Sequence, residues 1–185
     1  VFSAQDLLLF YVFFEMMLIP IYILVGVWGG PKRVSATITF VIYTMAGSLL
    51  MLASIVVFGL SQGTFSLIDS GVSSNDWVFL GFLIAFAVKA PLLPFHGWLR
   101  TAYVEAPPEI AALLSGVVSK TVVYGMLWIL LRHFPGPVDD WRTVILVLAS
   151  VGLVYGSLVA FRAPDVRGVL AYSSLAQMGL ITMGL

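Results

Sequence analysis

The chain contains no cysteine and few charged residues, and both shortages narrow what it can be. Without cysteine, it has no disulfides, thiolate metal sites or iron–sulfur clusters. Its two histidines, His96 and His133, lie far apart in the sequence, so we expect no metal site. Lysine plus arginine and aspartate plus glutamate number nine each in 185 residues. With no net charge, nothing favours nucleic acid or a strongly charged partner.

Hydrophobic residues dominate the composition. They make up 61% of the chain, against 10% charged residues, and the mean hydropathy is +1.06. Soluble domains carry about 25% charged residues. The composition therefore predicts an all-α polytopic membrane protein. The start has neither an initiator Met nor a basic region or cleavage site, so we do not expect it to be a signal peptide. The last residues stop within a short apolar run, so we expect an internal piece of a longer protein.

Six segments are long and apolar enough to be transmembrane helices, each of which needs roughly 20 residues. Polar, glycine-rich or proline-rich stretches separate them, and residues 61–76 are expected to form an exposed loop. Together they make one membrane domain over residues 1–185. The predicted helices cover residues 7–28, 34–60, 77–99, 108–131, 142–161 and 169–185.

The third segment carries a charge and two helix breakers in an otherwise apolar run, FAVKAPLLPFHGWL. Lys89 lies well inside the membrane, where an ionisable group costs several kcal/mol and usually has a function. Pro91 and Pro94 each remove a backbone donor, so we predict that the helix breaks just after the lysine. Broken helices occur at membrane depth only within protein or beside a wet cavity. The stretch therefore predicts a hydrated proton or ion site.

The charged residues of the loops predict the orientation. If the helices alternate in direction, one side of the membrane carries Lys32, Arg33, Arg100, Arg162 and Arg167. The other side carries Arg132 and Arg142 together with Asp69, Asp76, Asp139 and Asp140. By the positive-inside rule the first group is cytoplasmic, so the first helix enters from the outside.

Three ionisable residues remain inside predicted helices: Glu15, Lys89 and Lys120. One interpretation is a structural ion pair that fixes the packing of the helices, since buried membrane charges pair with one another. One carboxylate cannot neutralise two ammonium groups, however. At least one lysine should therefore release its proton more readily than a lysine in water. We infer a relay in which Glu15 holds Lys89 protonated, and separation of the pair drives the proton toward Lys120.

Other polar residues give weaker signals. His96 can relay protons near neutral pH, or it can bond backbone groups freed by the prolines. His133, in a predicted loop, is expected to be solvated. Hydroxyls and an amide can hold a chain of water, although in helix bundles they more often bond across helices. The candidates of this kind are Ser119, Tyr124, Ser174 and Gln177.

Two motifs resemble a known family. FAVKAPLLPFHGWL, followed by VEAPPEIAALLSGVVSKTVVYG, resembles the antiporter-like membrane subunits of respiratory complex I, a proton-translocating NADH–quinone oxidoreductase. YVFFEMMLIPIYILVGVWGG is similar to the chain M type, which is chain 4 in mitochondria. The resemblance covers essentially the whole chain. It implies the fifth to tenth helices of a fourteen-helix inverted-repeat fold.

The resemblance also implies roles for individual residues. Glu15 matches the glutamate of the family's fifth helix, and Lys89 matches its partner on the broken seventh helix. Lys120 matches the lysine of the eighth helix, which leads toward the second half-channel, and His96 matches the histidine of the PFH motif. The family further implies no cofactor in this chain, with NADH and quinone used by other subunits. Its partners are then the neighbouring membrane subunits, in the inner (plasma) membrane.

The chain departs from the family pattern at two places. Relatives usually have Pro-Asp-Ala-His after the Trp-Leu pair, where this chain has Arg100, Thr101, Ala102 and Tyr103. Gln177 stands where chain M types usually have histidine, and glutamine there is typical of chain L and of the Mrp cation/proton antiporters. Either the central relay runs through water here, or the chain belongs to another subtype.

The sequence thus predicts a proton-translocating subunit of NADH–quinone oxidoreductase, a translocase with no redox chemistry of its own. One alternative is a subunit of a Mrp-type Na⁺/H⁺ antiporter or of a related membrane-bound hydrogenase complex. A second alternative, of another class, is a structural membrane scaffold whose ion pairs are static.

Overall fold

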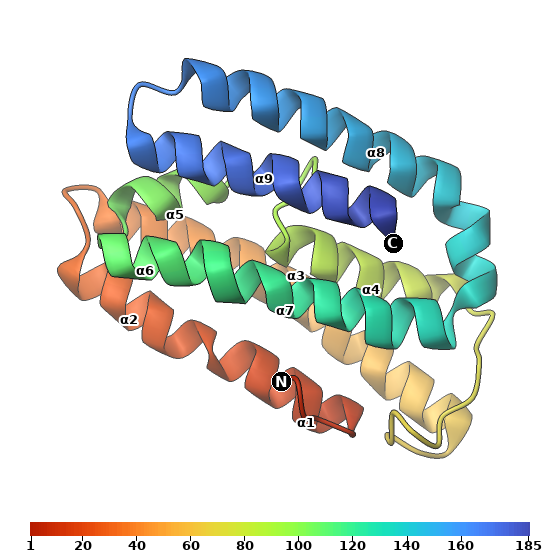
Figure 1. Ribbon diagram of the computed structural model, residues 1–185. Coiled ribbons are helices and arrows are strands. Elements are labelled where there is room, and N and C mark those ends of the chain that lie inside the picture. The colour runs from red at the N-terminus through yellow and green to blue at the C-terminus, as the bar shows by residue number, and fades with distance from the viewer.

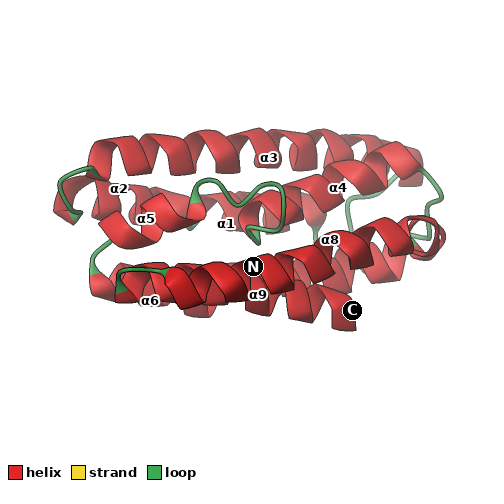
Figure 2. Ribbon diagram, turned by 90° about the horizontal axis from the view of Figure 1, so that it is seen from above, coloured by secondary structure: helices red, strands yellow, loops and turns green.

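The computed structural model describes all of residues 1–185, and helices run through most of them. Six helical rods lie side by side and alternate in direction, as Figures 1 and 2 show. The helices are α1 (Leu7–Met16), α2 (Leu18–Trp28), α3 (Arg33–Gln62), α4 (Asp76–Lys89), α5 (Leu99–Glu105), α6 (Pro108–Leu113), η1 (Leu114–Val118), α7 (Ser119–Gly125), η2 (Met126–Leu131), α8 (Pro135–Arg162) and α9 (Val166–Gly184). The two η elements are π-helices within one continuous rod, which α6 begins.

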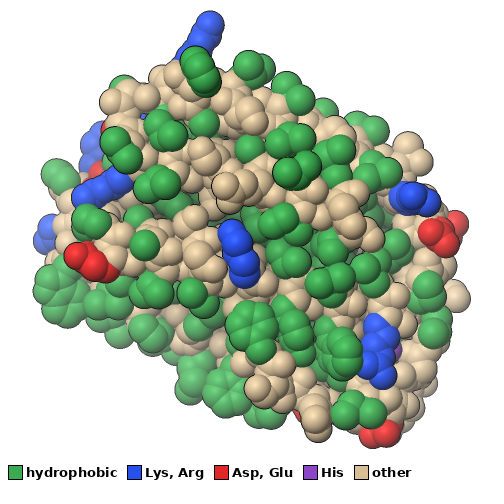
Figure 3. All heavy atoms as spheres, in the orientation of Figure 1, with side chains coloured by type: hydrophobic (Ala, Val, Ile, Leu, Met, Phe, Trp, Pro, Cys, Tyr) green, Lys and Arg blue, Asp and Glu red, His purple; other side chains and the backbone are tan.

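The all-α fold predicted from the sequence is confirmed. Four helical stretches are long and apolar enough to cross a membrane: 7–28, 33–62, 108–131 and 135–162. The third predicted helix is not among them, because its break leaves two shorter pieces. The helix α9 is not among them either, because its polar residues lower its hydropathy. Hydrophobic side chains cover the middle of the molecule, while charged ones gather mostly toward its two ends (Figure 3). This surface suits a multi-pass membrane protein.

Local signals set where most helices begin and end. The Asp6 carboxylate accepts hydrogen bonds from the backbone N–H groups of Leu8 and Leu9 and so caps the start of α1. Gly63, in the left-handed conformation with φ of 69°, ends α3. Pro108 fits the first turn of α6, where its missing N–H is not needed.

Two predicted boundaries differ from the structure. The helix expected from 142 begins at Pro135, because prolines in a first turn start a helix and do not form the expected turn. The helix expected from 169 begins at Val166, since the Asp165 side chain caps it. The helix expected over 77–99 is broken after Lys89, as predicted, and resumes as α5 at Leu99. The prolines fall between these two pieces.

Contacts between loops hold one end of the bundle together. Glu105 accepts two hydrogen bonds there, from Gly30 N through its carbonyl and from Lys32 N through its carboxylate. The guanidinium of Arg167 donates to the carbonyl of Val104 at 2.7 Å. Arg100 forms an exposed ion pair with Asp165 at 3.1 Å. The basic loop residues that strict alternation assigned to one side therefore meet at one end.

At the opposite end His133 is buried, and the prediction that it is solvated is wrong. Its side chain is fully buried, and its Nδ1 lies 3.1 Å from the carbonyl oxygen of Gly71. The backbone N–H of Ser73 donates to the carbonyl of His133 at 2.8 Å. The loop of residues 63–75 thus folds over the short corner between η2 and α8. The loop is not wholly exposed as expected, since Leu67 is also fully buried.

The helices α8 and α9 pack backbone against backbone at two glycines (Figure 1). A Cβ added at Gly156 would lie 2.9 Å from the carbonyl oxygen of Tyr172 and from the backbone nitrogen of Ala176. A Cβ at Gly179 would lie 2.7 Å from the carbonyl oxygen of Ala149. These contacts are too short for any side chain, so small residues decide how closely the two helices approach.

We expect Gly156→Ala and Gly179→Ala each to destabilise the protein by about 1–3 kcal/mol through overpacking. The thermal unfolding midpoint in detergent measures this effect. The control is Gly136→Ala on α8, where an added Cβ meets nothing within 4 Å. Alanine favours a helix over glycine, so this control should leave the midpoint unchanged or raise it. Equal midpoints for all three variants would contradict the close packing.

The loop over His133 should loosen in acid. Burial lowers the pKa of the His133 ring below its ordinary value of 6.5; the carbonyl of Gly71 opposes this shift, and the charge of Arg132 adds to it. The unfolded chain therefore takes up a proton at a higher pH than the folded one. The contribution of neutral His133 to the stability of the folded loop is complete above about pH 6.5. It is lost as the pH falls through the pKa of His133 in the folded protein.

Hydrogen–deuterium exchange of residues 63–75, corrected for the intrinsic effect of pH, tests this prediction. Exchange should be faster at about pH 5.5 than at about pH 7.5 in the original protein. His133→Gln cannot be protonated, so its corrected exchange should not depend on pH. A loop whose protection responds to pH equally in both proteins would refute the role of His133.

Candidate functional site

The break between α4 and α5 is where the sequence placed it. Ordinary helical bonding ends at Ala90, whose N–H donates to the carbonyl of Phe86. Beyond it, Leu92 N donates to Ala87 O at 2.8 Å and Phe95 N to Leu92 O at 2.7 Å, both in turns. Pro91 and Pro94 have no N–H to continue the helix. The break leaves Lys89 as the last helical residue of α4.

Lys89 is buried against α1 and pairs with Glu15. Its side chain is 3% exposed, and its Nζ lies 3.3 Å from Oε1 of Glu15. Nζ also donates to the backbone carbonyl of Phe14 at 2.6 Å. It lies 3.4 Å from the centroid of the Phe14 ring, a cation–π contact. One turn of α1 therefore supplies a carboxylate, a carbonyl and an aromatic face to a single ammonium.

The two partners differ in their surroundings. The Glu15 side chain is 22% exposed, whereas Lys89 is almost fully enclosed. A buried ammonium is costly unless it is paired and hydrogen-bonded. The contacts from α1 meet that requirement, so the protonated form of Lys89 depends on how closely α1 approaches. This arrangement can hold a proton and can release it if α1 and α4 separate.

Lys120, on α7, has no acidic partner. Its side chain is half-buried, and its Nζ donates to the carbonyl of Ser115 at 3.1 Å. The two ion pairs of the structure are Lys89–Glu15 and Arg100–Asp165, and neither includes Lys120. Ser115 precedes Lys120 by five residues and lies in η1, where the wide π-helical turns suit that spacing. A backbone dipole rather than a carboxylate therefore holds the second lysine.

His96 lies in the broken segment and packs toward α8. Its ring meets the ring of Tyr155 edge-on, with centroids 5.2 Å apart. Its Nδ1 is buried and has no hydrogen-bond partner. His96 makes no direct contact with Lys89 among the hydrogen bonds or ion pairs.

The four polar candidates for a water chain do not lie together. Ser119 and Ser174 are buried, and Ser174 Oγ lies 3.3 Å from Oγ of Ser115. Tyr124 instead belongs to an aromatic stack, with its ring 6.4 Å from that of Trp128 and 6.5 Å from that of Phe10. Gln177 is exposed and lines a groove between α8 and α9. The structure thus brings together only the two serines.

Two buried residues of this region were not recognised as functional from the sequence. The indole Nε1 of Trp98 donates to the carbonyl of Val88 at 2.9 Å, a group next to the broken end of α4. Tyr103, on α5, is 1% exposed and lies in a buried apolar cluster with Leu99 and Ile110. Aromatic residues are common in this chain, so only the position of these two near the break could have singled them out.

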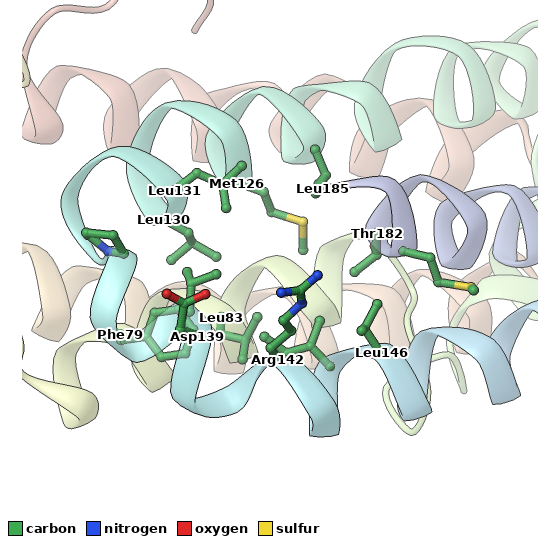
Figure 4. Close-up of a pocket in the computed structure, with 14 residues that line it drawn as sticks. Phe79, Leu83, Met126, Leu130, Leu131, Asp139, Arg142, Leu146, Thr182 and Leu185 are labelled. Carbon is green, nitrogen blue, oxygen red and sulfur yellow. The ribbon is translucent and has the colours of Figure 1, made fainter.

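A cavity of about 450 Å³ lies apart from these residues, between α4, η2, α8 and α9 (Figure 4). Its wall is mainly apolar, with Asp139 and Arg142 contributing the charges. None of Glu15, Lys89, His96 and Lys120 lines it. The structure also has no group of three or more histidine, cysteine, aspartate or glutamate residues that could hold a metal ion.

A multi-pass helical bundle with a buried lysine–glutamate pair at a broken helix defines an antiporter-like membrane protein. The chain belongs to the family described as NADH:quinone oxidoreductase/Mrp antiporter, TM, which matches residues 4–185. This finding confirms the family inferred from the two lysine-bearing motifs.

Individual relatives agree with this assignment. The chain is 41% identical over 191 residues to NADH-ubiquinone oxidoreductase chain 4 of Metridium senile, covering 100% of this chain and 39% of that one. Respiratory complex I from Thermus thermophilus with bound NADH superposes with a TM-score of 0.90 at 38% identity, covering 98% of this chain and 40% of its counterpart. The Mrp complex from Dietzia sp. DQ12-45-1b superposes with a TM-score of 0.86 at 28% identity, covering 97% of this chain and 35% of its counterpart. The chain thus spans about 40% or less of the length of these relatives.

The hydrogen bond from Trp98 to the carbonyl of Val88 allows a direct test of what stabilises the helix break. Trp98→Phe keeps an aromatic ring but leaves the carbonyl of Val88 without its donor. A buried carbonyl that loses its partner costs about 1–3 kcal/mol, so the thermal unfolding midpoint should fall. The control is Trp77→Phe, since Trp77 is exposed and its indole makes no hydrogen bond. If the two variants unfold at the same temperature, the Trp98 bond does not stabilise the break.

Proposed function

We propose that this chain takes part in proton translocation across the membrane, as a subunit of an NADH–quinone oxidoreductase of the complex I type. The observation that carries the proposal is the ion pair of Lys89 and Glu15, buried at a helix break in the interior of the bundle. Quinone reduction takes place in other subunits and drives the pump from a distance. In this role the chain is part of a translocase, without redox chemistry of its own.

The relay starts at Lys89. While α1 and α4 are in contact, the Glu15 carboxylate and the Phe14 carbonyl hold the proton on Lys89. Two unit charges about 4 Å apart interact by roughly 4 kcal/mol at an effective dielectric constant near 20. Separation of the pair removes stabilisation of that order, which corresponds to about three orders of magnitude in proton affinity. A modest movement of α1 is therefore enough to release the proton.

Lys120 is the acceptor in this scheme. It is held by the carbonyl of Ser115 and has no carboxylate partner. His96, with its buried and unpartnered Nδ1, is available as an intermediate carrier. In this scheme water bridges the intervals between these groups, and the buried side chains of Ser119 and Ser174 are available to hold it.

The surroundings of the chain follow from the same proposal. The end of the bundle that carries Lys32, Arg100 and Arg167 faces the cytoplasm, so the first helix enters from the outside. The membrane is the inner (plasma) membrane, and the neighbours are other membrane subunits of the complex. NADH and quinone bind to those other subunits. The Thermus and Dietzia structures that superpose on this chain are both complexes, which supports a partnered chain.

A cation/proton antiporter is the second candidate, because the Mrp complex superposes almost as well. The exposed Gln177, at a position where glutamine resembles the Mrp pattern, also favours it. The higher sequence identity to the Thermus complex I, 38% against 28%, favours the first candidate. Dependence of transport on Na⁺ in the absence of NADH distinguishes the two.

Lys89→Met tests the proposal in the assembled complex. Methionine fills a similar volume but carries no proton, so we expect assembly to be retained and proton translocation in membrane vesicles to fall about tenfold or more. The rate of vesicle acidification on addition of NADH measures this. Lys32→Met is the matched control, because only the backbone of Lys32 is bonded and its side chain is exposed.

Two outcomes would contradict the relay. If Lys89→Met pumps at the rate of Lys32→Met, Lys89 does not carry protons. If Lys89→Met prevents assembly while Glu15→Gln assembles and pumps normally, the pair acts as a static scaffold.

A further inference from the structure

Glu105, the last residue of α5, holds the turn that follows α2. Its backbone carbonyl accepts a hydrogen bond from Gly30 N at 2.9 Å, and its carboxylate Oε2 accepts one from Lys32 N at 2.8 Å. The end of α5 is itself held, because Arg167 donates to the carbonyl of Val104 at 2.7 Å. One residue of a fixed helix end therefore makes two directional bonds to a turn that is distant in the sequence.

The turn makes room for the carboxylate at Gly30. A Cβ added at Gly30 would lie 2.6 Å from Oε2 of Glu105, closer than real Cβ atoms approach another atom. Gly63 is the one glycine with a positive φ, so backbone conformation does not require glycine at position 30. The close approach of Glu105 accounts for it.

The turn and Glu105 end the two stretches that carry the buried ion pair. The first rod, residues 7–28, bears Glu15, and the turn at Gly30 follows it. The other stretch is the broken helix, which bears Lys89 on α4 and ends with Glu105 on α5. Glu15 and Gly30 are about 22 Å apart if the helical rise is extended to the turn. The two stretches are therefore joined twice, by the ion pair and by Glu105 at one end of the bundle.

Apolar packing also joins the first rod to α5 and α6. Ile21 and Val25 lie in one buried cluster with Tyr103 and Ile110. The hydrophobic effect is non-directional, so it selects the buried face of a helix more strongly than its position along the axis. Hydrogen bonds tolerate only small changes in distance and angle. The two bonds to Glu105 are therefore suited to fix how the first rod lies along the broken helix.

That position decides which turn of α1 meets Lys89. Its Nζ lies 3.3 Å from Oε1 of Glu15 and 2.6 Å from the carbonyl oxygen of Phe14. Half a helical turn is a rise of about 2.7 Å, so a slide of that size would take these partners out of hydrogen-bonding range. The ion pair requires a fixed register between the two stretches.

We propose that Glu105 is a positioning residue, which sets the register of the first rod against the broken helix and so places Glu15 beside Lys89. The inference rests on the proposed proton relay. Glu105 acts in it as a hydrogen-bond acceptor and carries no proton itself.

Glu105→Ala and Glu105→Gln in the assembled complex test this role. Alanine removes a hydrogen bond to a charged group, so the rate of proton translocation per assembled complex should fall about tenfold. Glutamine keeps an acceptor oxygen for Lys32 N and should retain most of the rate. A residue that carried protons would not be rescued by glutamine, so equal losses in both variants would overturn the positioning role. Glu109→Ala is the control, because Glu109 is exposed and makes no side-chain hydrogen bond or ion pair.

Gly30→Ala tests the same contact from the other side. Its Cβ should displace the carboxylate, so the variant should pump as slowly as Glu105→Ala. In the double variant the carboxylate is gone, and the nearest remaining atom of residue 105 is its Cα at 3.8 Å. The double variant should therefore lose no more than Glu105→Ala alone, and additive losses would contradict the inference. If Glu105→Ala does not assemble, a rate for Gly30→Ala equal to that of the control would overturn the role.

A background without the ion pair separates positioning from general stability. In Glu15→Gln there is no pair to place, so the addition of Glu105→Ala should change the remaining rate little. A further tenfold fall there would show a general weakening and would overturn the role.

The outcomes also separate this inference from the function on which it rests. Normal pumping by Lys89→Met would remove the relay itself. Lost pumping by Lys89→Met, together with equal rates for Glu105→Ala and Glu109→Ala, would overturn the positioning role alone.

Discussion

Enclosing the ammonium of Lys89 in an apolar interior is the constraint on which the rest of this bundle depends. Water is replaced by one turn of α1, where Glu15 and the carbonyl and ring of Phe14 surround the charge. No single contact suffices, because an isolated buried ion costs several kcal/mol that only pairing and hydrogen bonding together offset. The packing of α1 against α4 consequently decides how well this ammonium is stabilised.

The helix break follows from the same need. A continuous helix would bury Lys89 with all backbone groups bonded internally, whereas the prolines end α4 at the lysine and free carbonyls nearby. The indole of Trp98 satisfies one of these carbonyls by donating a hydrogen bond to that of Val88. The chain then resumes as α5, a short helix that buries Leu99, Ala102 and Tyr103. The break therefore both ends the helix that carries Lys89 and begins a separate piece of the bundle.

The two lysines inside the bundle are held by different chemistry. Lys89 has a carboxylate partner, while Lys120 has the carbonyl of a π-helical turn. A full negative charge stabilises an ammonium more than a dipole does. At the two ends of the bundle, by contrast, the exposed Arg100–Asp165 ion pair and the contact between His133 and Gly71 fix loops.

The sequence alone determined the class, because a composition this apolar with so few charges leaves only membrane helices. It also determined the break, since Pro91 and Pro94 cannot continue a helix, and it singled out Glu15, Lys89 and Lys120 as charges without water. The tertiary structure decided which distant segments contact one another, and the spacing of residues along the chain does not encode that. Contacts between distant segments bury His133 beneath residues 63–75, move Tyr124 into an aromatic stack and leave Gln177 on the outer face of α9. They also bring Ser115 of η1 to within 3.3 Å of Ser174 of α9, because partners across helices are chosen by packing in three dimensions.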